Sequence, residues 1–176
     1  MVTAAVAAIL CLKCVTVRKG LVSERQAIRA DWAEVDAVLV HRAAIVADLT
    51  SFVQSNAPPK ADPALDAAAR AANDARAALE TTHTQHHTIA ANAHLDDALA
   101  RLMLQVENYP KLEHRKKYAD LLESLKGAEY QIAVARRKYN EAVEHYNARL
   151  DLFPDNIVAS VTRLNKVDTY FQTPAI

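Results

Sequence analysis

The chain has 176 residues, of which 21 are basic and 21 acidic, so its formal net charge is zero. Proteins that bind nucleic acid normally carry a basic excess or a basic stripe, and this balance argues against such a partner. Hydrophobic residues make up 51% of the sequence, aromatic residues only 6%, and glycine occurs twice. Because β-rich and α/β folds need glycine in tight turns, the composition predicts an all-α fold with long helices.

Residues 1–17 form an apolar N-terminal segment with few polar side chains. A helix of about sixteen residues spans roughly 24 Å, somewhat less than the roughly 30 Å hydrocarbon core of a bilayer. Lys13 lies near the end of the segment, where its stem can reach the interface. We expect residues 1–17 to form a short or tilted single-pass transmembrane anchor. A signal-peptide-like segment, a soluble core helix and a true start further upstream stay open as alternatives.

Arg18 and Lys19 directly follow the apolar segment. The positive-inside rule then places these two residues, and with them the bulk of the chain, on the cytoplasmic side of the membrane. Cys11 and Cys14 have CxxC spacing, but no second pair follows for a zinc site and no βαβ pattern surrounds them for a redox site. We interpret both as apolar filler of the anchor, with lipidation near the membrane as the alternative.

The first long helix is predicted from Leu21 to Ala57, a run without proline or glycine that can continue the N-terminal segment as a stalk. Its apolar residues recur mostly every three or four positions and so share one stripe. The members of this stripe are Leu21, Ile28, Trp32, Val35, Leu39, Val46, Leu49 and Val53. Pro58 and Pro59 then remove backbone donors and end the helix.

The second helical region begins with Asp62 as its N-cap and Pro63 at its first position. An alanine-rich helix follows to about Leu79, and the stretch Thr81–Thr88 predicts a kink or a short loop. A new apolar stripe then leads to a stop at Asn108-Tyr109-Pro110. The two stripes are Leu65, Ala68, Ala72, Ala75 and Leu79, then Leu95, Leu99, Leu102 and Val106.

The third helical region, Lys116–Phe153, has the clearest periodicity, a coiled-coil-like heptad seam. Leu150 and Phe153 are expected to continue this seam with a one-residue shift, and Pro154 to stop it. A short helix within 155–166 and a tail from Tyr170 complete the chain. The seam residues are Tyr118, Leu121, Leu125, Ala128, Ile132, Ala135, Tyr139, Ala142 and Tyr146. Short connections between such helices favour an antiparallel up-down bundle.

Four histidines cluster in the second region: His83, His86, His87 and His94. On one continuous helix, His83 and His87 would lie one turn apart, which lets two imidazoles share a metal ion, and His94 would share nearly the same face. The metalloprotease pattern needs a glutamate where Thr84 stands. An exposed, pH-sensitive polar face is therefore the preferred interpretation. A metal site using His83, His87 and His94 is the alternative.

The sequence offers no catalytic residues that we can name. A phosphate loop and a serine nucleophile elbow both need glycines that are missing. Glu80 and His83 have the Glu-x-x-His spacing of di-metal bundles, but no partner motif of matching phase follows. We therefore predict a protein that is not an enzyme, takes no cofactor and binds no small-molecule substrate.

Several stretches, taken in order, resemble the motifs of the LemA family. They are Trp32-Ala33-Glu34-Val35-Asp36, Glu107-Asn108-Tyr109-Pro110-Lys111-Leu112, Arg136-Arg137-Lys138-Tyr139-Asn140 with Val143 and Tyr146-Asn147, Phe153-Pro154-Asp155-Asn156-Ile157-Val158-Ala159, and Tyr170-Phe171. Where the family usually has paired arginines, His41 and Arg42 stand here. The resemblance implies a bacterial helical bundle on an N-terminal transmembrane helix, with no catalytic residues to carry over. It also implies structural roles for Arg136, Arg137, Asn140, Asn147 and Asn156.

The sequence thus predicts three parts: an anchor at 1–17, a LemA-like bundle of three long helical regions plus a short terminal helix at 18–171, and a tail at 172–176. We expect a non-enzymatic, membrane-anchored scaffold or interaction protein. Its partners are the membrane, through the N-terminal helix, and a protein or a second copy, through helix faces. The alternative function is a metal- or pH-responsive binding module that uses His83, His87 and His94.

Overall fold

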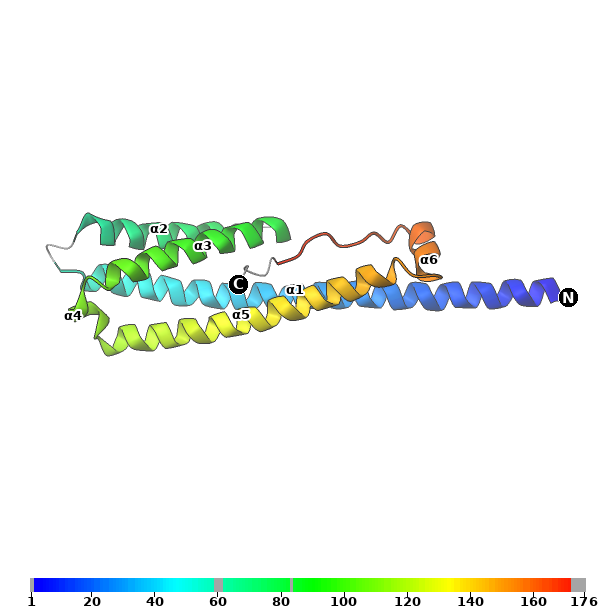
Figure 1. Ribbon diagram of the computed structural model, residues 1–176, viewed down its shortest axis with the longest axis horizontal. Coiled ribbons are helices and arrows are strands. Elements are labelled where there is room, and N and C mark those ends of the chain that lie inside the picture. Colours follow the sequence, from blue (N-terminus) through cyan, green and yellow to red (C-terminus); the bar gives the residue numbers. More distant parts are fainter. Residues whose placement is uncertain (1, 59–61, 83, 172–176) are drawn as a thin grey trace. The chain divides into compact units, whose positions relative to one another are not determined.

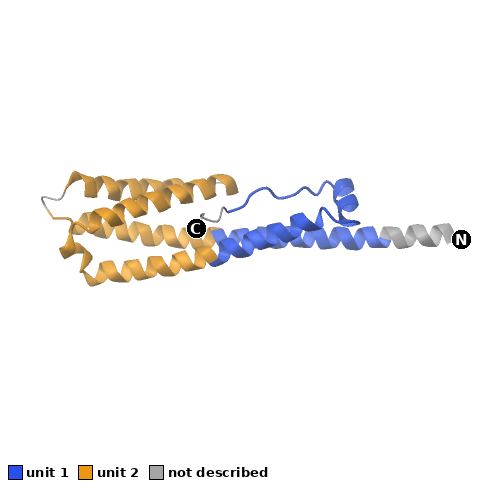
Figure 2. Cartoon of the chain, in the orientation of Figure 1, with its two compact units in different colours: residues 1–35, 134–176 blue, residues 36–133 orange. Residues whose placement is uncertain are grey.

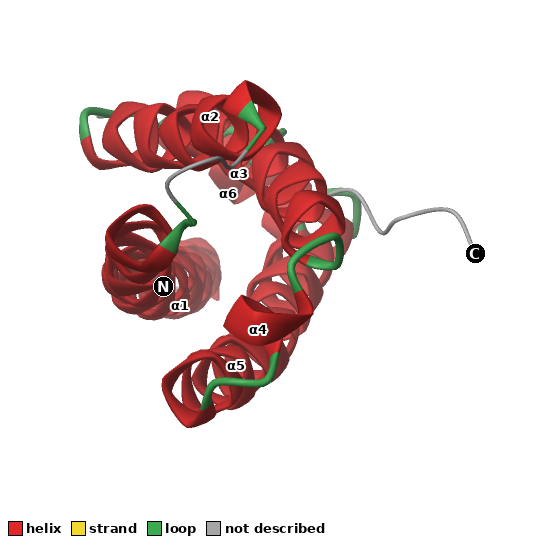
Figure 3. Ribbon diagram, turned by 90° about the vertical axis from the view of Figure 1, so that its left-hand side faces the viewer, coloured by secondary structure: helices red, strands yellow, loops and turns green. Residues whose placement is uncertain are grey.

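The computed structural model describes residues 2–58, 62–82 and 84–171, and it describes side chains from Leu12 onward. Every regular element in these ranges is a helix (Figures 1 and 3), so the all-α prediction is confirmed. The helices are α1 (Val2–Asn56), α2 (Pro63–Glu80), α3 (Gln85–Val106), α4 (Pro110–Glu113), α5 (Lys116–Arg149) and α6 (Asp155–Thr162).

Helix α1 is continuous from the apolar N-terminal segment into the first long helix, as its lack of helix-breaking residues allows. Most of the predicted anchor, residues 1–11, lies outside the residues whose side chains are described. Among the described residues, no helix offers a stretch that is both long enough and apolar enough to cross a membrane. The predicted tail at 172–176 also lies outside the described residues.

The contacts divide the chain into two compact units, shown in different colours in Figure 2. Unit 1 comprises Met1–Val35 and Val134–Ile176, and unit 2 comprises Asp36–Ala133. Each unit therefore contains part of both long helices, α1 and α5.

Unit 2 packs the C-terminal part of α1, from Asp36 on, against the N-terminal part of α5, and it also contains α2, α3 and α4. The α1 and α5 segments are antiparallel: Phe52 stacks on Tyr118 with ring centroids 6.4 Å apart, whereas the earlier Arg42 pairs with the later Glu129. Helices α2 and α3 lie side by side. The predicted stripe of α3 is confirmed, since Leu95, Leu99, Leu102 and Val106 are all buried.

The predicted start of α2 and the break after it are confirmed in unit 2. The Asp62 carboxylate accepts a hydrogen bond from the backbone N–H of Ala64 at 2.8 Å, which satisfies a donor of the first turn. Helix α2 ends at Glu80, and α3 begins at Gln85 with Thr84 as its N-cap. The one-turn helix α4 was not predicted, because a proline was interpreted only as a stop, although it also suits a first helical position.

Unit 1 pairs the N-terminal part of α1 with the C-terminal part of α5 and adds α6 and the segment 164–171, which has no regular structure. Trp32 contacts Tyr139, and the earlier Glu24 contacts the later Arg149, so the two helices are antiparallel here as well.

The end of the third seam was predicted correctly at Leu150, which is buried, but wrongly at Phe153. Helix α5 ends at Arg149, so Phe153 no longer follows the helical phase and its side chain is 79% exposed. Near this end, Val143 is fully buried and Ala142 only half-buried. The rest of the seam is confirmed, because its other eight predicted members are all buried: Tyr118, Leu121, Leu125, Ala128, Ile132, Ala135, Tyr139 and Tyr146.

Candidate functional site

A buried arginine forms the polar centre of unit 2. The Arg42 side chain is only 1% exposed and lies on the apolar stripe of α1. Its guanidinium donates to Asn92 at 2.9 Å and to Asp96, both on α3, and its Nε lies 2.8 Å from a carboxylate oxygen of Glu129 on α5. A buried charge of this kind needs all its partners in place, so it favours one register of the three helices.

Asn92 completes this group by donating to Asp96 at 3.1 Å. The two carboxylates are about half exposed, which lets water share their charge. Sequence reasoning noted Arg42 only as a departure from a paired-arginine pattern. Its position between Leu39 and Val46, where the periodicity calls for an apolar residue, was the signal that could have identified it.

A second polar arrangement, in unit 1, holds the C-terminal segment along α5. Asn147 donates to the carbonyl of Val167 at 2.6 Å and accepts from its N–H at 2.9 Å. Asn140, two turns earlier on α5, makes the same pair of bonds with Phe171 at 2.8 and 3.0 Å. An amide can satisfy both backbone groups of one residue in this way. The two asparagines therefore hold residues 167–171 by their backbone.

The end of this segment is fixed by an aromatic cluster in unit 1. Phe171 stacks on Trp32 with centroids 5.6 Å apart and meets Tyr139 edge-on at 6.0 Å. The guanidinium carbon of Arg136 lies 5.0 Å from the Phe171 ring centroid, a cation–π distance. Three separate family-like motifs thus meet at one place.

Two buried tyrosines of α5 add bonds to the same segment. Tyr139 donates to the carbonyl of Thr169 at 3.0 Å, and Tyr146 donates to that of Asn165 at 3.4 Å. Burial, which disfavours the phenolate, raises the pKa of Tyr139 to about 12, with smaller contributions from Tyr170 and Asp168. Burial also raises the pKa of Tyr146.

Ion pairs join α5 to its neighbours within unit 1. Arg149 bonds Glu24 of α1 and Asp155 of α6, and the hydrogen bond to Glu24 is the main cause of its raised pKa. Lys138 lies 2.7 Å from Glu34 and 3.0 Å from Asp31. These pairs add to the apolar packing that holds the helices side by side.

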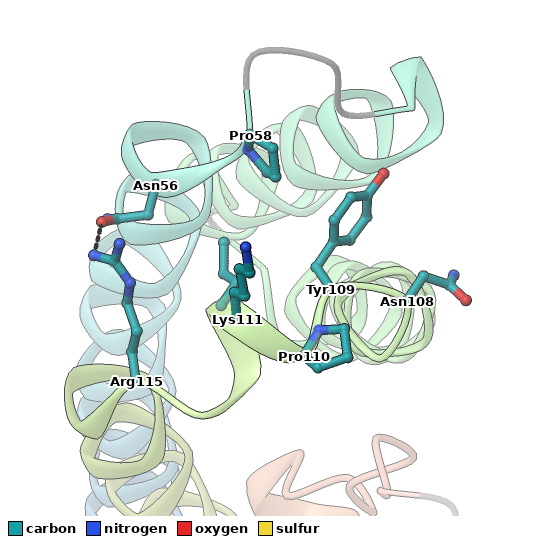
Figure 4. A pocket seen from close by; sticks show the side chains of 8 residues that line it. Asn56, Pro58, Asn108, Tyr109, Pro110, Lys111 and Arg115 are labelled. Carbon is teal, nitrogen blue, oxygen red and sulfur yellow. Dashed lines mark hydrogen bonds between the residues drawn. The ribbon is translucent and has the colours of Figure 1, made fainter.

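A hollow of about 340 Å³ lies in unit 2 where α1 ends and α4 begins (Figure 4). Tyr109 borders it and accepts a 2.7 Å bond from the backbone N–H of Asp62, while Arg115 donates to Asn56. Leu112, from the same family-like motif, is buried. The motif therefore fastens the α1–α2 connection to α4. The hollow's lining is Asn56, Pro58, Asn108, Tyr109, Pro110, Lys111, Leu112 and Arg115.

The candidate metal ligands do not share one helix in the way the metal interpretation assumed. That interpretation needed a continuous helix through His83 and His87, but α2 ends at Glu80 and α3 begins at Gln85. His83 itself lies outside the described residues. His87 and His94 are exposed on α3. Among the described residues, no group of three or more His, Cys, Asp or Glu side chains is placed to hold a metal ion.

A family model described as LemA family matches residues 31–175. The chain belongs to the LemA family. Two proteins of Paramagnetospirillum magneticum (strain ATCC 700264 / AMB-1), named magnetosome protein MamQ 1 and magnetosome protein MamQ 2, are each 32% identical to it over 87 residues. Magnetosome protein MamQ of Magnetospirillum gryphiswaldense (strain DSM 6361 / JCM 21280 / NBRC 15271 / MSR-1) is 30% identical over 87 residues. These matches cover 49% of this chain but only 32% of each relative.

In this LemA protein, most of the polar residues carried over from the family bind the chain itself. Asn156 accepts from the backbone N–H of Ile157 at the start of α6, and Arg137 faces solvent in a long 3.8 Å pair with Glu141. Arg136, Asn140 and Asn147 contact the C-terminal segment. The resemblance to the family implied only that these residues have structural roles. The ordered segment that Asn140 and Asn147 hold has no periodicity from which it could be predicted.

Proposed function

We propose that this LemA protein is a non-enzymatic, membrane-anchored helical scaffold. The observation that carries the proposal is the use of the family-like polar residues: the side chains of Asn140, Asn147 and Tyr109 each bond backbone groups of the chain itself. Groups committed in this way hold a shape and are not free to act on a substrate. A protein partner or a second copy would then bind helix faces of that shape.

The membrane part of the proposal rests on the apolar segment 1–17 and on Arg18 and Lys19, which follow it. The segment is short for a full crossing, but local thinning of the bilayer and snorkelling of Lys13 to the interface accommodate such mismatch. We place the protein in a bacterial inner membrane with its bundle on the cytoplasmic side, because the cations follow the apolar segment.

The test compares the full chain with a chain that begins at Leu21, both expressed in bacteria. We expect the full chain to sediment with membranes and to resist carbonate extraction. The shortened chain should be soluble and equally helical by circular dichroism. If the full chain is also released by carbonate, residues 1–17 do not anchor it and the membrane part of the proposal is wrong.

A further inference from the structure

One end of unit 1 exposes a cluster of large apolar side chains that its core does not use. Leu12 and Val15 come from α1, and the others from the α5–α6 turn and α6. A shallow hollow lined by Cys14, Val15, Arg18, Ile157, Val158, Val161 and Thr162 links Val15 of α1 to Ile157 and Val161 of α6. Leu12 lies one turn before Val15 on α1, and Leu152 and Phe153 lie in the turn that leads into α6. We call this surface the turn patch; its residues are Leu12, Val15, Leu152, Phe153, Ile157 and Val161.

The exposure of the turn patch is large for side chains of this kind. Phe153 and Val161 are each 79% exposed. Helix α6 is apolar on two sides: Val158 and Ala159 are buried in unit 1, whereas Ile157 and Val161, one turn apart, face outward. Single exposed apolar residues need no explanation, but a contiguous group marks a contact surface.

The exposed charges near the turn patch are mostly positive; the exception is Asp151, next to Leu152, which is paired with Lys166 at 2.8 Å. Lys13, Arg18 and Lys19 on α1 and Arg163 at the end of α6 are all exposed. The sequence from 12 to 22 contains no acidic residue. Between 152 and 163 the one acid is Asp155, which is buried and bonded to Arg149. An apolar patch edged by cations is complementary to an anionic lipid surface, which offers acyl chains below and phosphate groups above.

The position of the turn patch along α1 also favours a bilayer. Helix α6 meets α1 at Cys14–Arg18, the level at which the apolar segment Val2–Val17 ends. If that segment enters the bilayer, α6 is carried to the headgroup region, with its outward side chains at the depth that interfacial helices occupy. Leu12 and Val15 belong both to the patch and to the apolar segment.

We infer that the turn patch lies in the anionic surface of the membrane and forms a second lipid contact beside the anchor. This inference rests on the proposed membrane attachment. Phe153 and Val161 would insert at the headgroup level, and Arg18 and Arg163 would contact lipid phosphates. The contact would hold unit 1 against the bilayer and restrict its tilt relative to the membrane more than the anchor alone would.

The test places a fluorescent probe on the full chain, reconstituted into vesicles of phosphatidylcholine and phosphatidylglycerol. Cys11 and Cys14 are replaced by serine, and single cysteines are introduced by Val161→Cys or, as control, Tyr130→Cys, which is 73% exposed in unit 2. We expect blue-shifted emission at 161 and several-fold stronger quenching by headgroup-labelled lipid than at 130. Adding Phe153→Glu should reduce this quenching, whereas Leu104→Glu, at an exposed site in unit 2, should not.

Three outcomes would overturn the inference, and they differ from one another. If the chain floats with the vesicles but position 161 is as aqueous as 130, the patch does not touch lipid, although the anchor stands. If the shift at 161 grows with protein density at a fixed lipid composition and is indifferent to phosphatidylglycerol, the occupant is a second copy. If the chain does not associate with vesicles at all, the proposed anchor fails together with the patch.

Discussion

At the scale of single residues, Arg42 has the largest consequence for unit 2. It interrupts a stripe of buried apolar side chains, and its three partners lie on α3 and α5. A hydrophobic residue of similar size could fill the same volume without needing partners. The arginine therefore specifies how the helices align more than it adds to their stability.

Replacing Arg42 by alanine should lower the free energy of unfolding by about 2–3 kcal/mol. Alanine leaves a cavity and leaves Asn92, Asp96 and Glu129 without their partner. The loss of stability is moderated because Asp96 and Glu129 are half exposed and can be hydrated. Urea unfolding measures the change, with Arg70→Ala as control. Arg70 makes only an exposed pair with Asp66, worth about 0.5 kcal/mol or less. Equal effects of the two substitutions would contradict a special role for Arg42.

Arg42→Met should recover much of the stability lost in Arg42→Ala, because the methionine side chain refills the space without bringing a charge. If Arg42→Met is as unstable as Arg42→Ala, the ion pairs of Arg42 contribute more to stability than its packing does.

Tyr139 should make unit 1 sensitive to alkaline pH. Its folded pKa of about 12 lies above the ordinary value of 10, so the folded state holds the proton more tightly than the unfolded state does. The stabilisation is complete below pH 10 and is lost as the pH rises from 10 to about 12. In Tyr139→Phe, the loss of stability over this window should be smaller, with a remainder from Tyr118 and Tyr146, whose pKa values are also raised.

Urea unfolding at pH 8 and pH 11.5 measures this difference. Tyr130→Phe is the control, because that ring is exposed in unit 2 and its replacement should leave the wild-type pH profile unchanged. A profile of Tyr139→Phe that matches the wild type would mean that Tyr139 ionises equally in both states.

At the scale of elements, local chemistry determined what could be predicted. Asp62 and Pro63 specify the start of α2, and the stripes of α1, α3 and α5 follow the helical period. The error at Phe153 arose because apolar spacing continued past Arg149, where the helix ends. Periodicity reports which residues are apolar, but it does not report whether the backbone is still helical. Periodicity also could not predict the conformation of segment 164–171. That segment has no regular structure and is held by side chains of α5.

Asn147→Ala should release the middle of this C-terminal segment. The substitution removes both bonds to Val167, and a loss of about 1–2 kcal/mol of local stability should speed hydrogen exchange of the Val167 amide roughly tenfold or more. Exchange measured by NMR tests this, with Glu144→Ala on the exposed face of α5 as control. Asn147→Asp keeps an acceptor for the Val167 N–H and should give a smaller increase. Unchanged exchange in Asn147→Ala would show that the aromatic cluster alone fixes the segment.

The spacing of the histidines along α3 predicts how the protein responds to zinc. His87 and His94 are seven residues apart on this helix, about 10.5 Å along its axis, which is too far to share one ion. We therefore expect one equivalent of zinc to leave the melting temperature unchanged. A clear rise that is abolished by His87→Ala and by His94→Ala would instead support the metal-responsive alternative.

At the scale of the whole molecule, family-like motifs from distant parts of the sequence gather within each unit. In unit 1, Trp32, Tyr139 and Phe171 form one cluster, and in unit 2, Tyr109 meets Asp62. Motif order along the chain was enough to suggest the family. The contacts explain why the aromatic residues occur where they do: each fixes a connection or an end that helix packing alone would leave loose.

The balance of charge over the whole chain predicts how copies behave toward one another. With no net charge and an isoelectric point near 7.1, copies repel each other least at neutral pH. Light scattering of the full chain in a neutral detergent should therefore show maximal association near pH 7. Replacing the exposed Lys117 and Lys126 by glutamate makes the chain more acidic and should move this maximum to lower pH. Lys117→Glu combined with Glu123→Lys keeps the net charge and should leave the maximum in place.

The position of the maximum distinguishes net charge from apolar contact as the cause of association. Association through the turn patch would depend on Phe153 and Val161 and would persist when the charge is changed elsewhere. If the double lysine variant keeps its maximum near pH 7 while the uncharged substitution Phe153→Gln abolishes association, the patch governs contacts between copies in detergent. If the maximum moves with the charge and Phe153→Gln has no effect, the patch does not bind a second copy, which agrees with a lipid surface as its occupant.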